Sequence, residues 1–165
     1  MVIALTGTPG TGKTTVSEKL EEGFEVVDLT KFLEEKDIGR EVDGEREVRI
    51  GEMLEELEGE IFSDDTVVEG HLAHHLPADV CIVLRCRPDI LKERLSSRPY
   101  PDSKVRENVE SEKIDIILTE AVKNQETVIE IDTTEKSVEE TVEEIKEKLD
   151  ERENDYGNVD WSEFI

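Results

Sequence analysis

The sequence predicts an α/β fold in which a five-stranded parallel sheet is flanked by helices. Two observations predict it: short apolar runs alternate with stretches of helical periodicity, and a glycine-rich turn joins the first apolar run to the first helix. Strands that alternate with helices pair in parallel because each crossover helix returns the chain to the same edge of the sheet. At 165 residues the chain is long enough for one well-buried domain and too short for two ordinary ones.

The elements follow one another in a regular order. We predict strands at 2–5, 24–27, 66–68, 80–84 and 127–131. We predict helices at 13–20, 29–35, 50–62, 89–97 and about 105–123, and a closing amphipathic helix whose apolar stripe is Val138, Val142, Ile145 and Leu149. Residues 37–49 are rich in charge and are interpreted as a mobile insertion. Residues 153–165 show no period and are interpreted as a C-terminal tail after a domain at 1–152.

Residues 7–14, GTPGTGKT, match the pattern GxxxxGK[ST] between a strand and a helix. Glycines let backbone N–H groups turn around a phosphate, and the following helix presents its positive end. Lys13 would add a positive charge for the β and γ phosphates, and the Thr14 hydroxyl a ligand for Mg²⁺. The motif therefore predicts a P-loop that binds a nucleoside triphosphate rather than an ordinary glycine-rich turn. Its expected binding residues are Gly10, Thr11, Gly12, Lys13, Thr14 and Thr15.

A second acidic ligand is expected at the end of a neighbouring strand, where it can hold the water shell of the metal. Glu69 fits this position because it follows the apolar residues of the strand at 66–68. Many P-loop enzymes have aspartate there, so the glutamate is a departure. The alternative is that Glu69 is a solvated acid at a strand end.

The chain is strongly acidic, with 44 Asp and Glu against 20 Lys and Arg and a formal net charge of -24. Because nucleic-acid backbones are bound by clustered Lys and Arg, this balance argues against a general polyanion binder. Two compatible hypotheses explain the acidity: adaptation to high salt, and a surface for a basic partner. No signal-peptide pattern or membrane-length apolar run is present, so we expect a cytoplasmic protein. Cys81 and Cys86 are interpreted as buried thiols.

The segments LTGTPGTGKTT, VVEGH and VLRCRPDILKERLSSRPYPDSKVRENVESE carry a resemblance to the nucleoside monophosphate kinases. Over about residues 1–150 the chain most resembles the adenylate kinase isoenzyme 6 family, small archaeal and eukaryotic kinases also linked to ribosome maturation. The resemblance implies a flap segment that binds the monophosphate at about 28–57 and a short lid segment at about 98–106. With the acidic composition, it suggests a halophilic archaeon as the source.

The resemblance also implies roles for several basic residues. Arg94 and Arg98 would lie one turn apart at the lid hinge and clamp the phosphates, Arg98 also binding ATP, with Arg106 as a third clamp. Lys31, Arg40 and Arg46 are flap candidates for the acceptor phosphate. In each case the alternative is a solvated surface charge.

Three histidines follow Glu69. His71 is expected to act in the site, as the family tends to carry a functional histidine there. His71, His74 and His75 are not interpreted as a metal cluster, because GHLAHHL offers no acidic partner at ligand spacing, and the alternative is that they cap a loop. The lid segment is too short for a zinc-binding insertion.

The resemblance implies Mg²⁺-dependent transfer of the γ-phosphate of ATP to AMP or a related nucleotide. The alternative is an ATPase switch in small ribosomal subunit maturation and rRNA processing, which binds a basic platform ribosomal protein and has only secondary kinase activity. A third possibility is a kinase for another small acceptor, similar to shikimate or cytidylate kinases.

Overall fold

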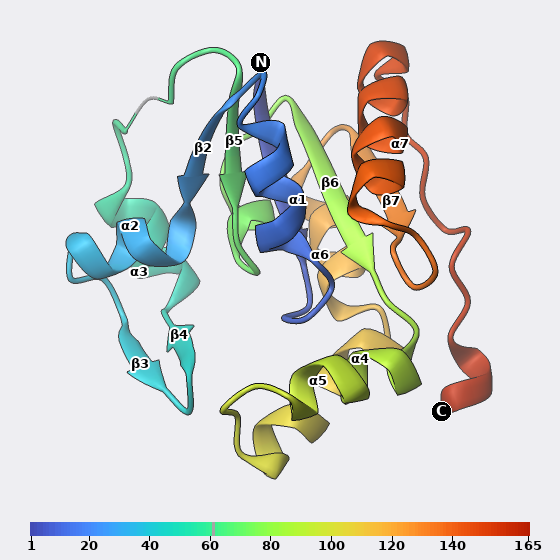
Figure 1. Cartoon of the computed structure of the whole chain (residues 1–165). Helices are drawn as coiled ribbons and strands as arrows, with labels where there is room; N and C mark the ends of the chain where they lie inside the picture. The colour runs from blue at the N-terminus through green and yellow to red at the C-terminus, as the bar shows by residue number, and fades with distance from the viewer. Residues whose placement is uncertain (61) are drawn as a thin grey trace.

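The computed structural model describes residues 1–60 and 62–165, and its centre is a five-stranded parallel sheet (Figure 1). The strands are β1 (Val2–Gly7), β2 (Glu25–Asp28), β5 (Thr66–Glu69), β6 (Val80–Arg85) and β7 (Val128–Asp132). Their order across the sheet is β2-β5-β1-β6-β7, so β1 lies in the middle. The predicted fold class is confirmed.

Helices cover both faces of the sheet. They are α1 (Lys13–Leu20), α2 (Leu29–Glu35), α3 (Ile50–Glu56), α4 (Pro88–Ser96), α5 (Asp102–Lys113), α6 (Ile116–Asn124) and α7 (Val138–Glu151). Two short 3₁₀ turns, η1 (Ala73–His75) and η2 (Ser162–Phe164), complete the described elements. Within these elements no helix is both long and apolar enough to cross a membrane.

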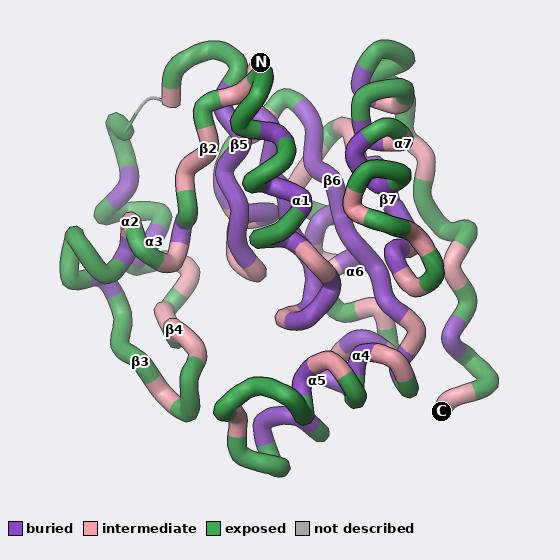
Figure 2. Tube along the Cα trace, viewed as in Figure 1, coloured by how far each residue is buried: buried purple, intermediate pink, exposed green. Residues whose placement is uncertain are grey.

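Alternating side chains of the strands supply the two cores. Ile3 and Leu5 of β1 pack with the apolar stripes of α1 and α7, whereas Ala4 packs on the opposite face with residues of α2, α3 and α6. This follows from the two-residue period of a strand, which sends successive side chains to opposite faces. Figure 2 shows that the middle of the sheet is buried. Strands covered on both faces read as continuous apolar runs, which is why they could be located in the sequence.

Residues 37–49, interpreted as a mobile insertion, contain regular secondary structure. They contain an antiparallel hairpin of β3 (Arg40–Val42) and β4 (Glu45–Glu47). Asp43 and Gly44 both have positive φ, 51° and 85°. Two consecutive residues of this kind form the tight turn that Asp-Gly favours between strands, so a local signal was present in the sequence.

Two predicted helices have different limits. The predicted helix at about 105–123 is divided into α5 and α6, because Asp115 adopts a left-handed conformation with φ 57°. The predicted helix at 50–62 ends at Glu56 in the structure, and a turn with Gly59 at φ 88° follows. Ile61, which falls within the predicted helix, lies outside the described residues.

Residues 153–165, interpreted as a tail, pack along the outer edge of β7. Asp155 forms a bridge beside Ile129, and Trp161 is buried with 8% of its surface exposed. Backbone N–H groups of residues 157–159 donate to one carboxylate oxygen of Glu130 at 3.0–3.3 Å. The segment has no period because its hydrogen bonds go to a side chain and to one strand edge rather than to its own helix.

The buried guanidinium of Arg85 joins β6 to β7 and to the junction of α5 and α6. Arg85 donates to Glu112 and to Glu130, each at 2.6 Å, and it also contacts Asp115 at the break between α5 and α6. It further donates to the backbone carbonyl of Glu112 at 3.1 Å, a group that a continuous helix would use itself. The break therefore has a physical reason: it turns a carbonyl and a carboxylate toward a buried cation.

We predict that Arg85→Met destabilises the fold by about 3–5 kcal/mol, because it leaves Glu112 and Glu130 as uncompensated buried carboxylates. The measurement is thermal and denaturant unfolding followed by circular dichroism. The matched control is Arg87→Met, which removes an arginine paired with the exposed Asp89 and is expected to leave the midpoint unchanged. Equal midpoints for both variants and the parent chain would show that the Arg85 network adds nothing to stability.

Candidate functional site

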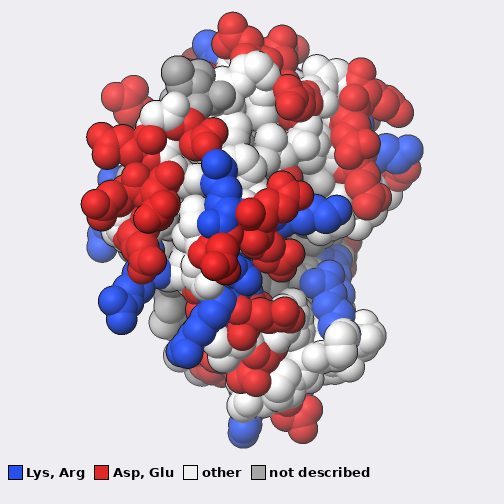
Figure 3. All heavy atoms as spheres, turned by 90° about the vertical axis from the view of Figure 1, so that its left-hand side faces the viewer, with Lys and Arg blue, Asp and Glu red and all other residues white. Residues whose placement is uncertain are grey.

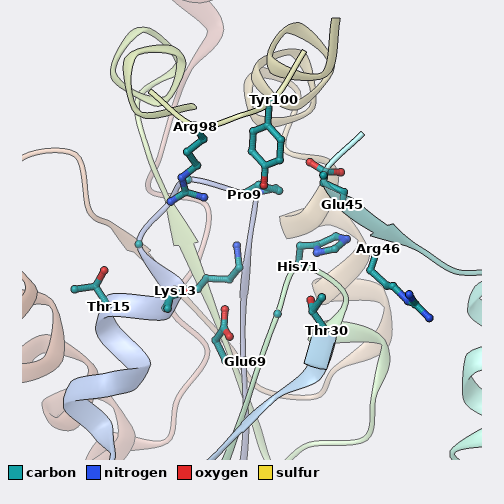
Figure 4. Close-up of a pocket in the computed structure, with 15 residues that line it drawn as sticks. Pro9, Lys13, Thr15, Thr30, Glu45, Arg46, Glu69, His71, Arg98 and Tyr100 are labelled. Carbon is teal, nitrogen blue, oxygen red and sulfur yellow. The ribbon is translucent and has the colours of Figure 1, made fainter. Parts of the chain in front are cut away.

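A cavity of about 210 Å³ opens at the carboxyl ends of the central strands (Figure 4). The parallel register brings these ends together, since Glu69 of β5 lies beside Leu5 of β1 on one side and Asp28 of β2 on the other. The cavity is lined by Pro9, Gly10, Gly12, Lys13, Thr14, Thr15, Thr30, Gly44, Glu45, Arg46, Glu69, Gly70, His71, Arg98 and Tyr100. The predicted site residues outside this lining are Thr11, Arg94 and the further candidates Lys31, Arg40 and Arg106.

The P-loop lies on the floor of the cavity and leads into α1. Gly12 has φ 103° and precedes the helix, and no atom lies within 4 Å of the place where its Cβ would be. Gly10 has φ 93°, and a Cβ there would lie 2.9 Å from a methyl carbon of Leu91. Gly12 thus has open space beside it, whereas Gly10, which has no side chain, permits the loop to pack closely against Leu91. No side chain in the described structure caps the start of α1, so its first N–H groups remain available to an anion.

Lys13 and Glu69 form the charged centre of the site. Lys13 Nζ donates to the carbonyls of Gly7 at 2.8 Å and Thr8 at 3.1 Å. Burial lowers the pKa of Lys13 to about 8, although Glu69 acts in the opposite direction. Burial also raises the pKa of Glu69, against the nearby positive charge of Lys13. A cation and a carboxylate held with little water interact more strongly than they would on the surface.

The hydroxyl-bearing side chains beside this pair are accessible. Thr14 and Thr15 are exposed at the start of α1, whereas Thr11 is buried and donates its hydroxyl to the Thr8 carbonyl at 2.8 Å. Thr14 and Glu69 both line the cavity. Hydroxyl and carboxylate oxygens are the hard donors that Mg²⁺ prefers, so the residues fit that ion.

His71 lies on the side of the cavity toward the hairpin. Burial lowers its pKa to about 4, helped by the charge of Lys13, so the ring is neutral near pH 7. Arg46 also lines this side, and it donates to the carbonyls of Ile38 at 2.9 Å and Gly39 at 3.2 Å. The other two flap candidates are placed elsewhere: Arg40 lies in a separate depression, and Lys31 is exposed on α2.

A second hollow of about 340 Å³ adjoins the first and shares Gly10, Gly12, Thr15 and Arg98 with it. Arg94 lines this second hollow and donates to the carbonyls of Gly10 and Thr133, both at 3.3 Å. Arg94 therefore ties α4 to the P-loop, whereas Arg98 faces both hollows. Arg106 is exposed on α5 and lines neither hollow in the described residues.

The flap and lid sides of the cavity contact each other through residues that sequence reasoning missed. Glu45 of β4 accepts from Lys104 at 3.1 Å and from Asn108 at 2.6 Å, both on α5. A Cβ on Gly44 would lie 2.9 Å from the Tyr100 ring, so the hairpin turn packs closely against the lid segment. No sequence signal joins residues this far apart, although the Asp-Gly turn could have located the hairpin.

His74 and His75, whose own segment GHLAHHL offers no acidic partner, find one elsewhere in the fold. Glu120 of α6 lies 2.7 Å from His74 Nε2 and 3.3 Å from His75 Nε2. The partner was missed because it is 46 residues away in the chain and reaches η1 only through the packing of α6. None of the three residues lines the cavity.

Comparison with known proteins identifies the family. A relative from Pyrococcus abyssi named "Putative adenylate kinase" is 50% identical over 99% of this chain and 92% of its own length. One of the same name from Natronomonas pharaonis is 44% identical over the full length of both. This chain belongs to their family. The resemblance found in the sequence is therefore confirmed, and the family described as "AAA domain" also matches, over residues 3–115.

Two solved kinase structures share the fold of this chain, although their sequences are at most 19% identical to it. Deoxyadenosine kinase from M. mycoides with bound dATP is 16% identical with a TM-score of 0.59, covering 91% of this chain and 100% of that one. Shikimate kinase from Bacteroides thetaiotaomicron is 19% identical with a TM-score of 0.56, covering 91% and 98%. At these identities the likeness extends to the fold alone.

We predict that Lys104→Met loosens the hairpin, because Glu45 loses the cation that holds it against α5. Hydrogen exchange of residues 40–47 should quicken about fivefold, which corresponds to roughly 1 kcal/mol of local stability. The matched control is Lys113→Met, which removes a lysine paired with Glu110 on the same helix. Unchanged hairpin exchange in Lys104→Met, or the same change in both variants, would contradict this role of Lys104.

Proposed function

We propose that this chain is an adenylate kinase that uses Mg²⁺ and transfers the γ-phosphate of ATP to AMP. The observation that carries the proposal is the convergence of Lys13, Thr14, Glu69 and Arg98 on one cavity bounded by the P-loop, the flap segment and the lid segment. The names of the full-length relatives support it. The fold likeness to a nucleoside kinase agrees with it but carries no weight for the substrate.

The two hollows suit the two substrates. The second hollow, beside Arg94, Thr133 and Lys136, would take the base and ribose of ATP, and the P-loop its phosphates. The first hollow extends from the P-loop toward Thr30, Arg46 and His71, where AMP would lie. Arg98 faces both hollows and would therefore lie over the phosphoryl group in transfer.

Stabilisation of charge is the main work that phosphoryl transfer asks of a protein, since no covalent enzyme intermediate is needed. Lys13 would leave the carbonyls of Gly7 and Thr8 and bind the β and γ phosphate oxygens. Thr14 and Glu69 would hold Mg²⁺ directly or through water, and the ion would neutralise charge on the same oxygens. Arg98 would bind the transferred group most tightly when its charge is spread over the equatorial oxygens.

The contact between hairpin and lid gives the site a means of excluding water. With Glu45 bound to Lys104 and Asn108, the hairpin is held against the lid segment, and residues of both line the cavity on this side. Exclusion of water favours transfer to AMP over hydrolysis of ATP. His71, neutral and beside the acceptor side of the cavity, would orient the attacking phosphate of AMP, or a water molecule when AMP is absent.

A second candidate function is an ATPase that acts in small ribosomal subunit maturation and rRNA processing. The observation that favours it is the acidic surface, shown for the face that carries the flap helices in Figure 3. A chain with a net charge of -24 would attract a basic protein such as one of the ribosomal platform, and moderate salt would slow that encounter. The same charge would suit a halophilic cytoplasm, where salt screens repulsion between carboxylates.

We predict that Lys13→Ala lowers phosphoryl transfer to AMP by about a thousandfold or more with the fold intact, since Lys13 serves phosphate charge. The measurement is a coupled assay of ATP with AMP, GMP, CMP or UMP, and of ATP alone, with circular dichroism to check folding. The control is Lys19→Ala, an exposed lysine on the same helix that pairs loosely with Glu139 at 3.9 Å.

Several outcomes of this assay separate the candidates. Transfer to AMP well above hydrolysis of ATP alone supports the kinase, and hydrolysis that no monophosphate suppresses supports the ATPase. Near-normal turnover in a folded Lys13→Ala chain would remove both, because both use the same P-loop.

We predict that Arg98→Ala lowers kcat by about a hundred- to a thousandfold, because a clamp on the transferred group acts mainly in the transition state. The dissociation constant for ATP, measured by calorimetry, should change by only a few fold. Arg87→Ala, which alters an arginine paired with the exposed Asp89 and lining neither of the two hollows, is the control and should retain full kcat. If Arg98→Ala also retains it, Arg98 is a surface charge.

A further inference from the structure

The cluster of His74, His75 and Glu120 offers three ligand atoms within 4.8 Å of one another. The two histidines belong to η1, which follows the strand that ends at Glu69, and the carboxylate comes from α6. We propose that these three side chains form a divalent-metal site, separate from the phosphate cavity and suited to Zn²⁺. The proposal goes beyond the kinase function and does not depend on it.

The ligand set and its spacing support Zn²⁺. Two imidazole nitrogens and one carboxylate oxygen are a common protein ligand set for this ion, with water in the fourth position. In a tetrahedral site with ligand bonds of about 2.0–2.2 Å, neighbouring ligand atoms lie about 3.3–3.6 Å apart. The same oxygen of Glu120 lies 2.7 Å from His74 Nε2 and 3.3 Å from His75 Nε2. A small rotation of the exposed carboxylate would therefore admit the ion between the three atoms.

The outer nitrogens of both rings have partners of the kind that metal-bound histidines use. A ring bound to metal through Nε2 carries a proton on Nδ1 and donates it to a nearby oxygen. His74 Nδ1 lies 2.9 Å from the buried Thr6 hydroxyl, which can accept that hydrogen bond. His75 Nδ1 lies 3.3 Å from the side-chain amide of Asn124, which presents an oxygen once the amide is turned over.

The backbone beneath the rings is also held in place. The side-chain amide of Gln125 donates to the carbonyls of His74 and Leu76, both at 2.7 Å. Fixed rings lose less entropy when an ion binds than mobile ones do. These contacts come from the end of α6 and the residue after it, the same region that supplies Glu120 and Asn124.

Burial is graded across the cluster. The His74 side chain is 1% exposed, that of His75 13% and that of Glu120 42%. An ion could therefore enter from solvent at Glu120 and be sheltered by the two rings, and a chain with a net charge of -24 raises the local concentration of cations. Bound there, the ion would join η1 to α6, and through His74 and Thr6 it would brace the residue that precedes Gly7 of the P-loop.

The test uses the full chain, treated with a chelator and then saturated with Mg²⁺ and ADP so that the phosphate cavity is occupied. Zn²⁺ is titrated by calorimetry, and Co²⁺ serves as a spectroscopic probe because tetrahedral Co²⁺ has intense visible bands. We expect one equivalent to bind, and the midpoint of thermal unfolding to rise by about 5 °C or more at a hundredfold excess of free Zn²⁺ over its dissociation constant.

Variants locate the binding. His75→Ala and Glu120→Gln, which alter the two more accessible ligands, should each weaken Zn²⁺ binding at least about tenfold and abolish the tetrahedral Co²⁺ spectrum. Glu126→Gln removes an exposed carboxylate just after α6 and is the matched control. Binding that Glu120→Gln leaves intact would overturn the proposal, as would an absence of tetrahedral Co²⁺ bands. Loss of the bound equivalent in His71→Asn, with His75→Ala unaffected, would assign the ion to the phosphate cavity and also overturn it.

Discussion

Parallel pairing around β1 is the constraint on which the rest of this molecule depends. Parallel strands end at the same edge, so β1, β2 and β5 deliver the P-loop, Asp28 and Glu69 to one place although these residues are far apart in the chain. The outermost strand, β7, also contributes at this edge. The hydroxyl of Thr133, which follows β7, contacts the carbonyls of Thr11 at 2.8 Å and Arg85 at 2.9 Å. Strand register thus fixes the floor of the cavity independently of the side chains of the flap and lid segments.

Buried cations connect this sheet to its surroundings in a chain that has few cations to use. Lys13, Arg85 and Lys104 are each less than 9% exposed, and each is held by oxygen atoms of another element or loop. Arg85 joins β6 to the break between α5 and α6 and, through Glu130, to residues 157–159. Lys104 joins the hairpin to α5. Of the three, Arg85 is the one paired with two buried carboxylates, so its removal would leave Glu112 and Glu130 without a counter-charge in low dielectric and would cost far more than the loss of a surface ion pair.

Burial in the cavity shifts the pKa values of neighbouring site residues in different ways. Burial disfavours charge on Lys13, Glu69 and His71 alike, but Lys13 and Glu69 offset each other while His71 has no nearby acid among its main influences. His71 is therefore neutral near pH 7 beside Lys13 and Glu69. A neutral ring can both donate and accept a hydrogen bond, which suits a role in orientation better than one in charge neutralisation.

The amino-acid sequence by itself determined the elements whose signals are local. The P-loop motif, the apolar strand runs and the stripe of α7 predicted the fold class, because each signal lies within a few residues of chain. For the same reason Lys13, Thr14 and Glu69 could be predicted as site residues, and they line one cavity in the structure. The Asp-Gly turn of the hairpin is an equally local signal. Tertiary structure alone decided which distant groups meet: Glu45 with Lys104 and Asn108, His74 with Glu120, and Arg85 with the carboxylates that interrupt a helix. Such pairs leave no trace in periodicity, since whether two polar side chains meet depends on the packing of whole helices against the sheet rather than on the residues beside them.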